Sequence, residues 1–134
     1  MSDKTLSRLI RQTKTQTDAI RRELSAIDEH LASINQQIAV LENEITQAYN
    51  APSEYSYFID GFVTATKQKI SDKCQERLYY QGLQADCLEN LRQVVANQKR
   101  FEILQSNYRR HVKYTEDKKE QNTLDDLSKG QIIK

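Results

Sequence analysis

Residues that break helices or form turns are scarce in this chain of 134 residues, which contains one proline, three glycines and no tryptophan. A chain with so little turn punctuation is expected to form long helices. No run of 18 apolar residues occurs, so no membrane-spanning helix is predicted. The first 14 residues are charged and polar where a secretory signal needs an apolar stretch. Together with the length, these absences predict a cytoplasmic protein of one domain.

Residues suited to catalysis or metal binding are also few. Cys74 and Cys87 lie 13 residues apart on one predicted helix, which separates them by roughly 20 Å and rules out a disulfide between them. Neither belongs to a Cys-x-x-Cys or Cys/His cluster. The two histidines, His30 and His111, fall on different predicted helices, and no Gly-rich phosphate loop, GxSxG or HExxH motif is present. We therefore expect no enzyme, no metal site and no cofactor.

What the sequence does contain is an apolar heptad repeat over its first third. Thirteen positions, most of them apolar, follow one another at alternating steps of four and three: Leu6, Ile10, Thr13, Thr17, Ile20, Leu24, Ile27, Leu31, Ile34, Ile38, Leu41, Ile45 and Ala48. A period of 3.5 residues keeps one apolar seam aligned along a helix that supercoils around a partner. The pattern predicts a coiled coil and favours an interaction protein.

The charges are segregated along the chain, although the net charge is only +1. Residues 1–22 carry six basic and two acidic residues, a net +4, and residues 99–113 carry five basic residues and one acidic residue, also a net +4. Between them, residues 23–60 contain seven acidic residues and no lysine or arginine. Such asymmetry concerns partners and orientation and says nothing about the fold.

The only proline marks the predicted bend. We expect a helix over about 3–49, a bend at 50–53 in which Ser53 caps the next helix, and a second helix over about 54–125. A short connection makes the helices antiparallel neighbours, with residue 3 beside a residue near 100. The predicted fold is all-α, one long antiparallel two-helix coiled-coil hairpin over 1–127. The second helix overhangs, and residues 128–134 form a disordered tail.

The second helix carries apolar stripes that its predicted partner cannot all cover. Ile59, Val63, Thr66 and Ile70 match the seam of the first helix, whereas Phe58, Phe62, Ala65 and Lys69 form a parallel stripe about 100° around the helix. The second stripe is either an exposed binding patch or the edge of a broad seam. Further along, Leu88, Leu91, Val95 and Gln98 predict one seam and Val94, Phe101, Leu104 and Tyr108 a shifted one. Phe101, Leu104, Tyr108 and Val112 are expected to overhang without a partner.

Two short segments resemble flagellar export proteins of the FliJ/YscO type. Residues 54–59, Glu-Tyr-Ser-Tyr-Phe-Ile, are similar to the family's Tyr-x-x-Phe-Ile segment. Residues 120–126, Glu-Gln-Asn-Thr-Leu-Asp-Asp, are similar to its closing Glu-Gln-Lys-x-Leu-Asp-Glu, with Asn122 in place of Lys and Asp126 in place of Glu. Chain length, the two helix lengths and the basic open end agree with this family.

The resemblance implies a stalk protein of the type III export apparatus, cytoplasmic and held at the inner face of the membrane only through its partners. Those partners are a hexameric export ATPase, whose pore the stalk enters, the cytoplasmic domain of the export gate, and export chaperones. The family's gate-binding stripe maps onto Phe58, Phe62, Ala65 and Lys69, where Lys69 departs from the family's His. The basic open end is expected to contact the ATPase ring through Arg8, Arg11, Lys99, Arg100, Arg109, Arg110 and Lys113.

Other interpretations remain at this stage. One is a generic cytoplasmic coiled-coil adaptor that forms homodimers, and another is a prefoldin-like chaperone in which residues 55–59 form a strand. The basic stretches also raise nucleic-acid binding, but no DNA-binding motif accompanies them, and we expect no nucleic-acid partner.

Overall fold

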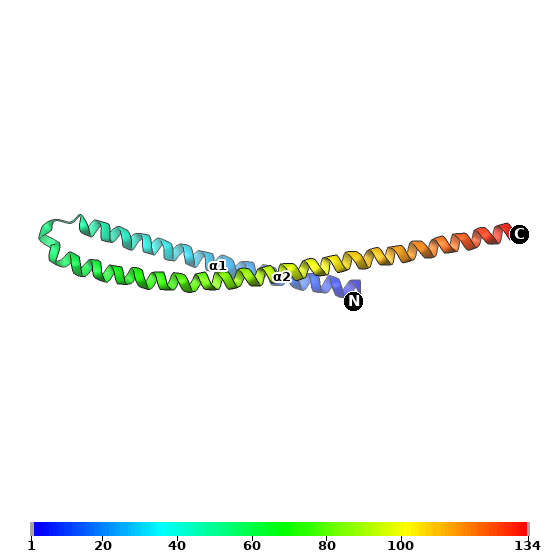
Figure 1. Cartoon of the computed structure of the whole chain (residues 1–134), viewed down its shortest axis with the longest axis horizontal. Coiled ribbons are helices and arrows are strands. Elements are labelled where there is room, and N and C mark those ends of the chain that lie inside the picture. Colours follow the sequence, from blue (N-terminus) through cyan, green and yellow to red (C-terminus); the bar gives the residue numbers. More distant parts are fainter. Residues whose placement is uncertain (1, 134) are drawn as a thin grey trace. The chain divides into compact units, whose positions relative to one another are not determined.

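The structure of the protein is a computed structural model that describes residues 2–133, with side chains as far as residue 130. Helix α1 spans Asp3–Tyr49, a 3-10 helix, η1, spans Ser53–Tyr55, and helix α2 spans Ser56–Ile133. Residues 2–133 contain no strand. The chain turns back once, between α1 and α2 (Figure 1). The predicted all-α two-helix hairpin is confirmed.

The bend occupies residues 50–55 and is two residues longer than predicted. Backbone amides of Asn50 and Ala51 donate to carbonyls three residues earlier, at 3.2 and 3.1 Å, and close the last turn of α1. Pro52 has an extended backbone, with φ −55° and ψ 145°, and starts η1 without a side-chain cap. The expected capping role of Ser53 is therefore wrong, because Ser53 is already the first residue of η1. The strand considered for residues 55–59 is not formed, since these residues lie in η1 and α2.

The chain divides into two packed units. The first, which we call the open-end unit, contains residues 1–17 and 93–134, and the second, the bend unit, contains residues 18–92. In each unit a segment of α1 runs antiparallel to a segment of α2. All thirteen predicted seam positions of α1 are buried or half-buried, from Leu6 and Ile10 in the open-end unit to Ile34 and Ile38 in the bend unit. The heptad pattern of α1 therefore identified its packed face.

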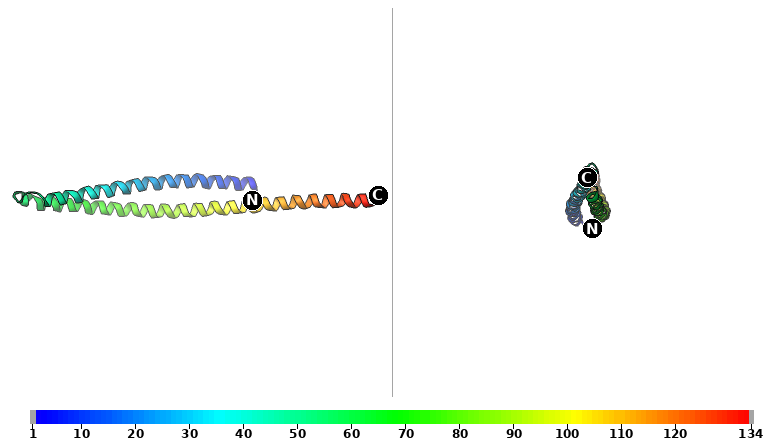
Figure 2. Two further views of the ribbon diagram at one scale, coloured as in Figure 1. Left: turned by 90° about the horizontal axis from the view of Figure 1, so that it is seen from above. Right: turned by 90° about the vertical axis from the view of Figure 1, so that its left-hand side faces the viewer.

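In the bend unit the two helices lie side by side (Figure 2), but they contribute unequally to the seam. Helix α1 supplies isoleucines and leucines, whereas the middle of α2 supplies the half-buried Lys73, Arg77, Tyr80 and Gln84. Polar atoms of this row reach partners on α1: Arg77 Nη1 donates to Asn35 Oδ1 at 3.2 Å, and Gln84 Nε2 donates to Asp28 Oδ1 at 2.8 Å. The aliphatic parts of these long side chains cover the seam, while their polar ends reach water and partner side chains.

Helix α2 uses one uninterrupted heptad row, which corrects the two shifted seams predicted for it. The row runs by steps of four and three through Ile59, Val63, Thr66, Ile70, Lys73, Arg77, Tyr80, Gln84, Cys87, Leu91, Val94, Gln98, Phe101 and Gln105, all buried or half-buried. Leu88 and Leu104, which were expected in the seams, are 44% and 49% exposed. The prediction from the apolar residues of α2 was wrong because position in the heptad, and not polarity, decides which side chain faces α1.

In the open-end unit the register brings Asp3 beside Gln105 and Arg109, and not beside a residue near 100 as predicted. The longer bend accounts for part of this shift. Phe101 is half-buried and therefore does not overhang as expected, and Val112 is half-buried as well. From residue 113 to residue 130 every side chain is exposed, and no other described segment of the unit lies beside this part of α2 (Figure 2).

The disordered tail predicted over 128–134 is wrong as far as the structure describes it, because α2 continues through Ile133. No proline interrupts the segment, and the single Gly130 lowers helix propensity by only about 1 kcal/mol relative to alanine. Adding a residue to an existing helix costs far less than starting a new one. None of the described helices is long and apolar enough to cross a membrane.

Candidate functional site

The stripe of Phe58, Phe62, Ala65 and Lys69 lies on the solvent side of α2, next to the seam. Phe58 is 70% exposed and Phe62 46% exposed, and Ala65 and Lys69 are also exposed. The neighbouring row behaves as a core, since Val63 and Thr66 are buried and the Thr66 hydroxyl donates to the Phe62 carbonyl at 2.8 Å. Of the two interpretations of the stripe, the exposure of its four residues agrees better with an exposed patch than with the edge of a broad seam.

The stripe ends at a groove between the helices of the bend unit. The groove has a volume of about 400 Å³ and is lined by Gln36, Gln37, Val40 and Leu41 from α1 and by Lys69, Asp72 and Lys73 from α2. Val40 is 50% exposed at its wall. Lys69 belongs to both the stripe and the groove, so Phe58, Phe62, Ala65 and the groove form one continuous surface. This continuity was not visible in the sequence, because it depends on the register of α1 against α2.

The seven basic residues expected to contact the ATPase ring all lie in the open-end unit. All seven are exposed. Arg8 and Arg11 line one surface depression on α1, whereas Arg109, Arg110 and Lys113 line another on α2. The structure therefore brings these residues into one unit but not into one pocket.

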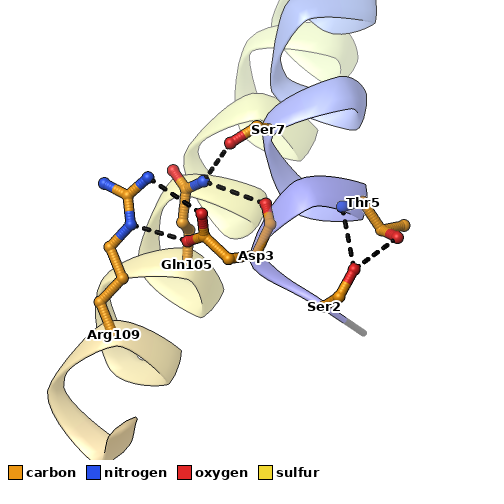
Figure 3. A network of polar contacts seen from close by, with 6 residues as sticks. All are labelled: Ser2, Asp3, Thr5, Ser7, Gln105 and Arg109. Carbon is orange, nitrogen blue, oxygen red and sulfur yellow. Dashed lines mark hydrogen bonds and ion pairs between the residues drawn. The ribbon is translucent and has the colours of Figure 1, made fainter. Parts of the chain in front are cut away.

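Arg109 differs from the other six because it already has an anionic partner. Its Nε lies 2.7 Å from Asp3 Oδ1 and its Nη2 lies 3.3 Å from Asp3 Oδ2, a bidentate pair between α1 and α2 (Figure 3). Beside it, Gln105 Nε2 donates to Ser7 Oγ at 2.7 Å and to the Asp3 carbonyl at 3.4 Å. Ser2 accepts from the Thr5 amide at 3.2 Å and caps the start of α1. This network holds the first turn of α1 on α2, which assigns Arg109 a structural contact in addition to any role toward a partner.

The network was missed by sequence reasoning, although one signal pointed to it. Asp3 precedes Ile10 by seven residues and Gln105 follows Gln98 by seven, so both stand at heptad positions of their rows. When the heptad rows of both helices end in polar residues, the last pair of facing positions between the helices is expected to be polar. The predicted seam of the first helix began at Leu6 and no predicted seam of the second helix included Gln105, so this layer lay outside the predicted rows.

We expect Asp3 to titrate below the ordinary range of aspartate. Hydrogen bonds from the Arg109 side chain lower the pKa of Asp3, with further lowering from the Arg109 charge and from Gln105. A lowered pKa means that ionised Asp3 favours the paired state above its ordinary pKa of about 3.9, and that this contribution is lost as the pH falls through the lowered value. An NMR titration of the Asp3 carboxyl checks this. Arg109→Gln should return the pKa toward the ordinary value, whereas the adjacent Arg110→Gln should leave it unchanged; equal effects of the two variants would contradict the pairing.

The two units carry opposite charge. The open-end unit contains 13 basic and 7 acidic residues, a net +6, and the bend unit contains 7 basic and 12 acidic residues, a net −5. The acidic character is strongest at the bend, where residues 40–62 include Glu42, Glu44, Glu54 and Asp60 and no basic residue. The separation by packed unit is sharper than the near-neutral total suggests, and it gives each unit a different class of preferred partner.

The cysteines have packing roles. Cys87 is buried in the seam, and its Sγ lies 3.5 Å from the Ile20 carbonyl oxygen. Burial raises the pKa of the Cys87 thiol, and Glu23 and Asp28 raise it further. Cys74 is half-buried, and both cysteines are free. Among the described residues, no group of three or more His, Cys, Asp or Glu side chains is arranged to hold a metal ion.

No protein-family model, curated protein or solved structure matches this chain.

Proposed function

We propose that the protein is a non-enzymatic coiled-coil stalk of a type III export apparatus, of the FliJ/YscO type. In this proposal the open-end unit contacts the pore of the hexameric export ATPase and stimulates ATP hydrolysis. The stripe of Phe58, Phe62, Ala65 and Lys69 contacts the cytoplasmic domain of the export gate. The protein works in the cytoplasm, reaches the inner face of the membrane only through these partners, and also meets export chaperones.

The observation that carries the proposal is the presence of two exposed surfaces of different chemistry on the two units. A coupling protein must bind two partners at separate places. Here one unit offers arginines and lysines for an acidic partner surface, and the other offers two exposed phenylalanines beside a groove. Exposed aromatic rings and arginines are the side chains most often found as binding anchors. The resemblance of residues 54–59 and 120–126 to the family supplies the identity of the partners.

The residues chosen to test the ATPase contact follow from the contacts of Arg109. Because Arg109 holds Asp3, its replacement would disturb the start of α1 as well as any partner contact. Arg110 and Lys113 line the same depression, and their side chains make no ion pair with an acidic residue in the described chain. They report on a partner with less structural disturbance.

We expect Arg110→Glu with Lys113→Glu to abolish stimulation of the hexameric export ATPase. Charge reversal replaces attraction by repulsion, slows encounter and weakens binding, most strongly at low salt. The measurement is the rate of ATP hydrolysis as the chain is added, with circular dichroism to show an unchanged helix content. Lys118→Glu with Lys119→Glu is the matched control, because it makes the same charge change at exposed positions of the same helix and should stimulate normally. Normal stimulation by the Arg110/Lys113 variant would contradict the proposed orientation.

The generic adaptor interpretation makes a different prediction for the same experiment. An adaptor without a role in export has no reason to change the rate of ATP hydrolysis. Absence of stimulation by the wild-type chain would therefore favour the adaptor over the stalk.

A further inference from the structure

Exposed aromatic side chains gather at the bend together with acidic residues. Between residues 40 and 62, Tyr49, Tyr55, Tyr57, Phe58 and Phe62 are 61%, 54%, 87%, 70% and 46% exposed. The same segment contains four acidic residues and no basic residue. Glu42, Glu54 and Asp60 are exposed and Glu44 is half-buried. We call these five aromatic and four acidic residues the acidic bend surface.

A second exposed surface on the same chain has the opposite charge. Over residues 99–114 of α2, Ile103, Leu104, Tyr108 and Tyr114 are 60%, 49%, 39% and 64% exposed. Lys99, Arg100, Arg110 and Lys113 are exposed on the same stretch. We call these eight residues the basic segment. Arg109 is excluded from it because it pairs with Asp3.

The chemistry of the two surfaces is complementary. The basic segment carries four cations, with one exposed acidic residue, Glu102, on the same stretch, and the bend carries four anions and no cation. Both surfaces also expose apolar side chains. Arginine also stacks favourably on tyrosine and phenylalanine rings. Tyr57 and Phe58 are already in edge-to-face contact, with ring centroids 5.6 Å apart, so they present a joint aromatic surface to such a cation.

We propose that a second copy of this chain covers these surfaces, with the basic segment of one copy on the acidic bend surface of the other. A second copy is favoured over other occupants because it accounts for both surfaces at once. An anionic membrane or a nucleic acid would cover the basic segment but would be repelled by the bend. A cationic partner would cover the bend and leave the basic segment exposed.

Self-association has a consequence for function. The acidic bend surface includes Phe58 and Phe62, and the basic segment includes Lys99, Arg100, Arg110 and Lys113, so both overlap the surfaces assigned above to partners. Association of the chain with itself therefore competes with partner binding. This competition rests on the proposed function, whereas the self-association does not.

The test is sedimentation equilibrium of the full chain without any partner. We expect a concentration-dependent mass above that of one chain at low salt, with a dissociation constant that rises by about tenfold or more when the ionic strength is raised from about 0.05 to about 0.5 M. A chain that stays monomeric at about 100 μM and low salt overturns the proposal, since even weak association appears at that concentration. A monomer that is retained by anionic vesicles or heparin overturns it as well, and assigns the basic segment to an anionic partner.

A charge exchange between two variants makes the test specific. Glu54→Lys with Asp60→Lys changes the bend, and Arg100→Glu with Arg110→Glu changes the basic segment. Each variant alone should be monomeric, because its two substitutions bring the net charge of the changed surface from four to zero and remove its attraction to the other surface. Mixed in equal amounts, they should associate again, because the unchanged basic segment of the first variant meets the unchanged acidic bend surface of the second.

The control for the charge exchange is Lys118→Glu with Lys119→Glu, which should associate like the wild type. Circular dichroism verifies that each variant keeps its helices. Association of either bend or segment variant on its own, or no association of the mixture, overturns the proposal. Because no ATPase or export gate is present, failure here leaves the proposed function unaffected, and failure of ATPase stimulation leaves the self-association unaffected.

Discussion

Ile34→Asp is expected to unfold the bend unit, and Ile27→Asp is expected to have a similar but slightly smaller effect. Ile34 is 3% exposed and Ile27 is 7% exposed in the seam of α1. The substitution removes an apolar side chain whose burial contributes about 1.5–3 kcal/mol and introduces a carboxylate without a partner. Together these changes should destabilise the unit by about 4 kcal/mol or more, a large part of the stability of a typical small domain.

Thermal melting followed by circular dichroism measures this effect. Ala32→Asp is the matched control, because Ala32 is exposed on the same helix and its substitution introduces the same charge. The control should cost only the difference in helix propensity, up to about 0.7 kcal/mol. Unchanged melting of Ile34→Asp would show that another face of α1 is packed.

Phe58→Ala with Phe62→Ala should separate binding from stability. The two residues are 70% and 46% exposed while the adjacent Val63 and Thr66 are buried, so the melting temperature should remain near that of the wild type. Binding to the cytoplasmic domain of the export gate should weaken by about 2 kcal/mol or more, a change of about thirtyfold, if the rings are anchors. Affinity is measured by calorimetry with the gate domain in excess, so that self-association does not limit binding.

Leu78→Ala is the control for this prediction. Leu78 is 67% exposed in the same unit but lies outside the stripe, so its truncation removes exposed apolar surface without touching the proposed contact. A large fall in the melting temperature of the double variant would show that the rings belong to the core, and the stripe would then be withdrawn as a site. Unchanged affinity with unchanged melting would instead contradict the gate contact.

The register explains why the polar network at Asp3 and the groove beside Lys69 could not be derived from spacing within either helix. A sequence pattern states which side of a helix is apolar, but two antiparallel helices can slide along each other in steps of a heptad with little change in that pattern. The length of the bend decides among these registers. Here the bend runs to Tyr55 rather than to Ser53, and Asp3 meets Gln105 and Arg109.

The sequence by itself determined the helical class, the single bend near Pro52 and the packed face of α1, because these depend on local propensity and on a strict apolar period. It also determined the separation of charge along the chain. Only the tertiary structure decided the packed row of α2, in which Lys73, Arg77 and Gln84 occupy heptad positions while Leu88 and Leu104 are exposed. The physical reason is that α2 packs along the regular helix α1, so the side chains of α2 that face α1 recur with the heptad period. Position in this row, and not polarity, therefore decides which side chains of α2 are buried. The same constraint leaves Phe58 and Phe62 outside the seam and allows Arg109 to form an ion pair with Asp3. Neither outcome follows from residue type alone.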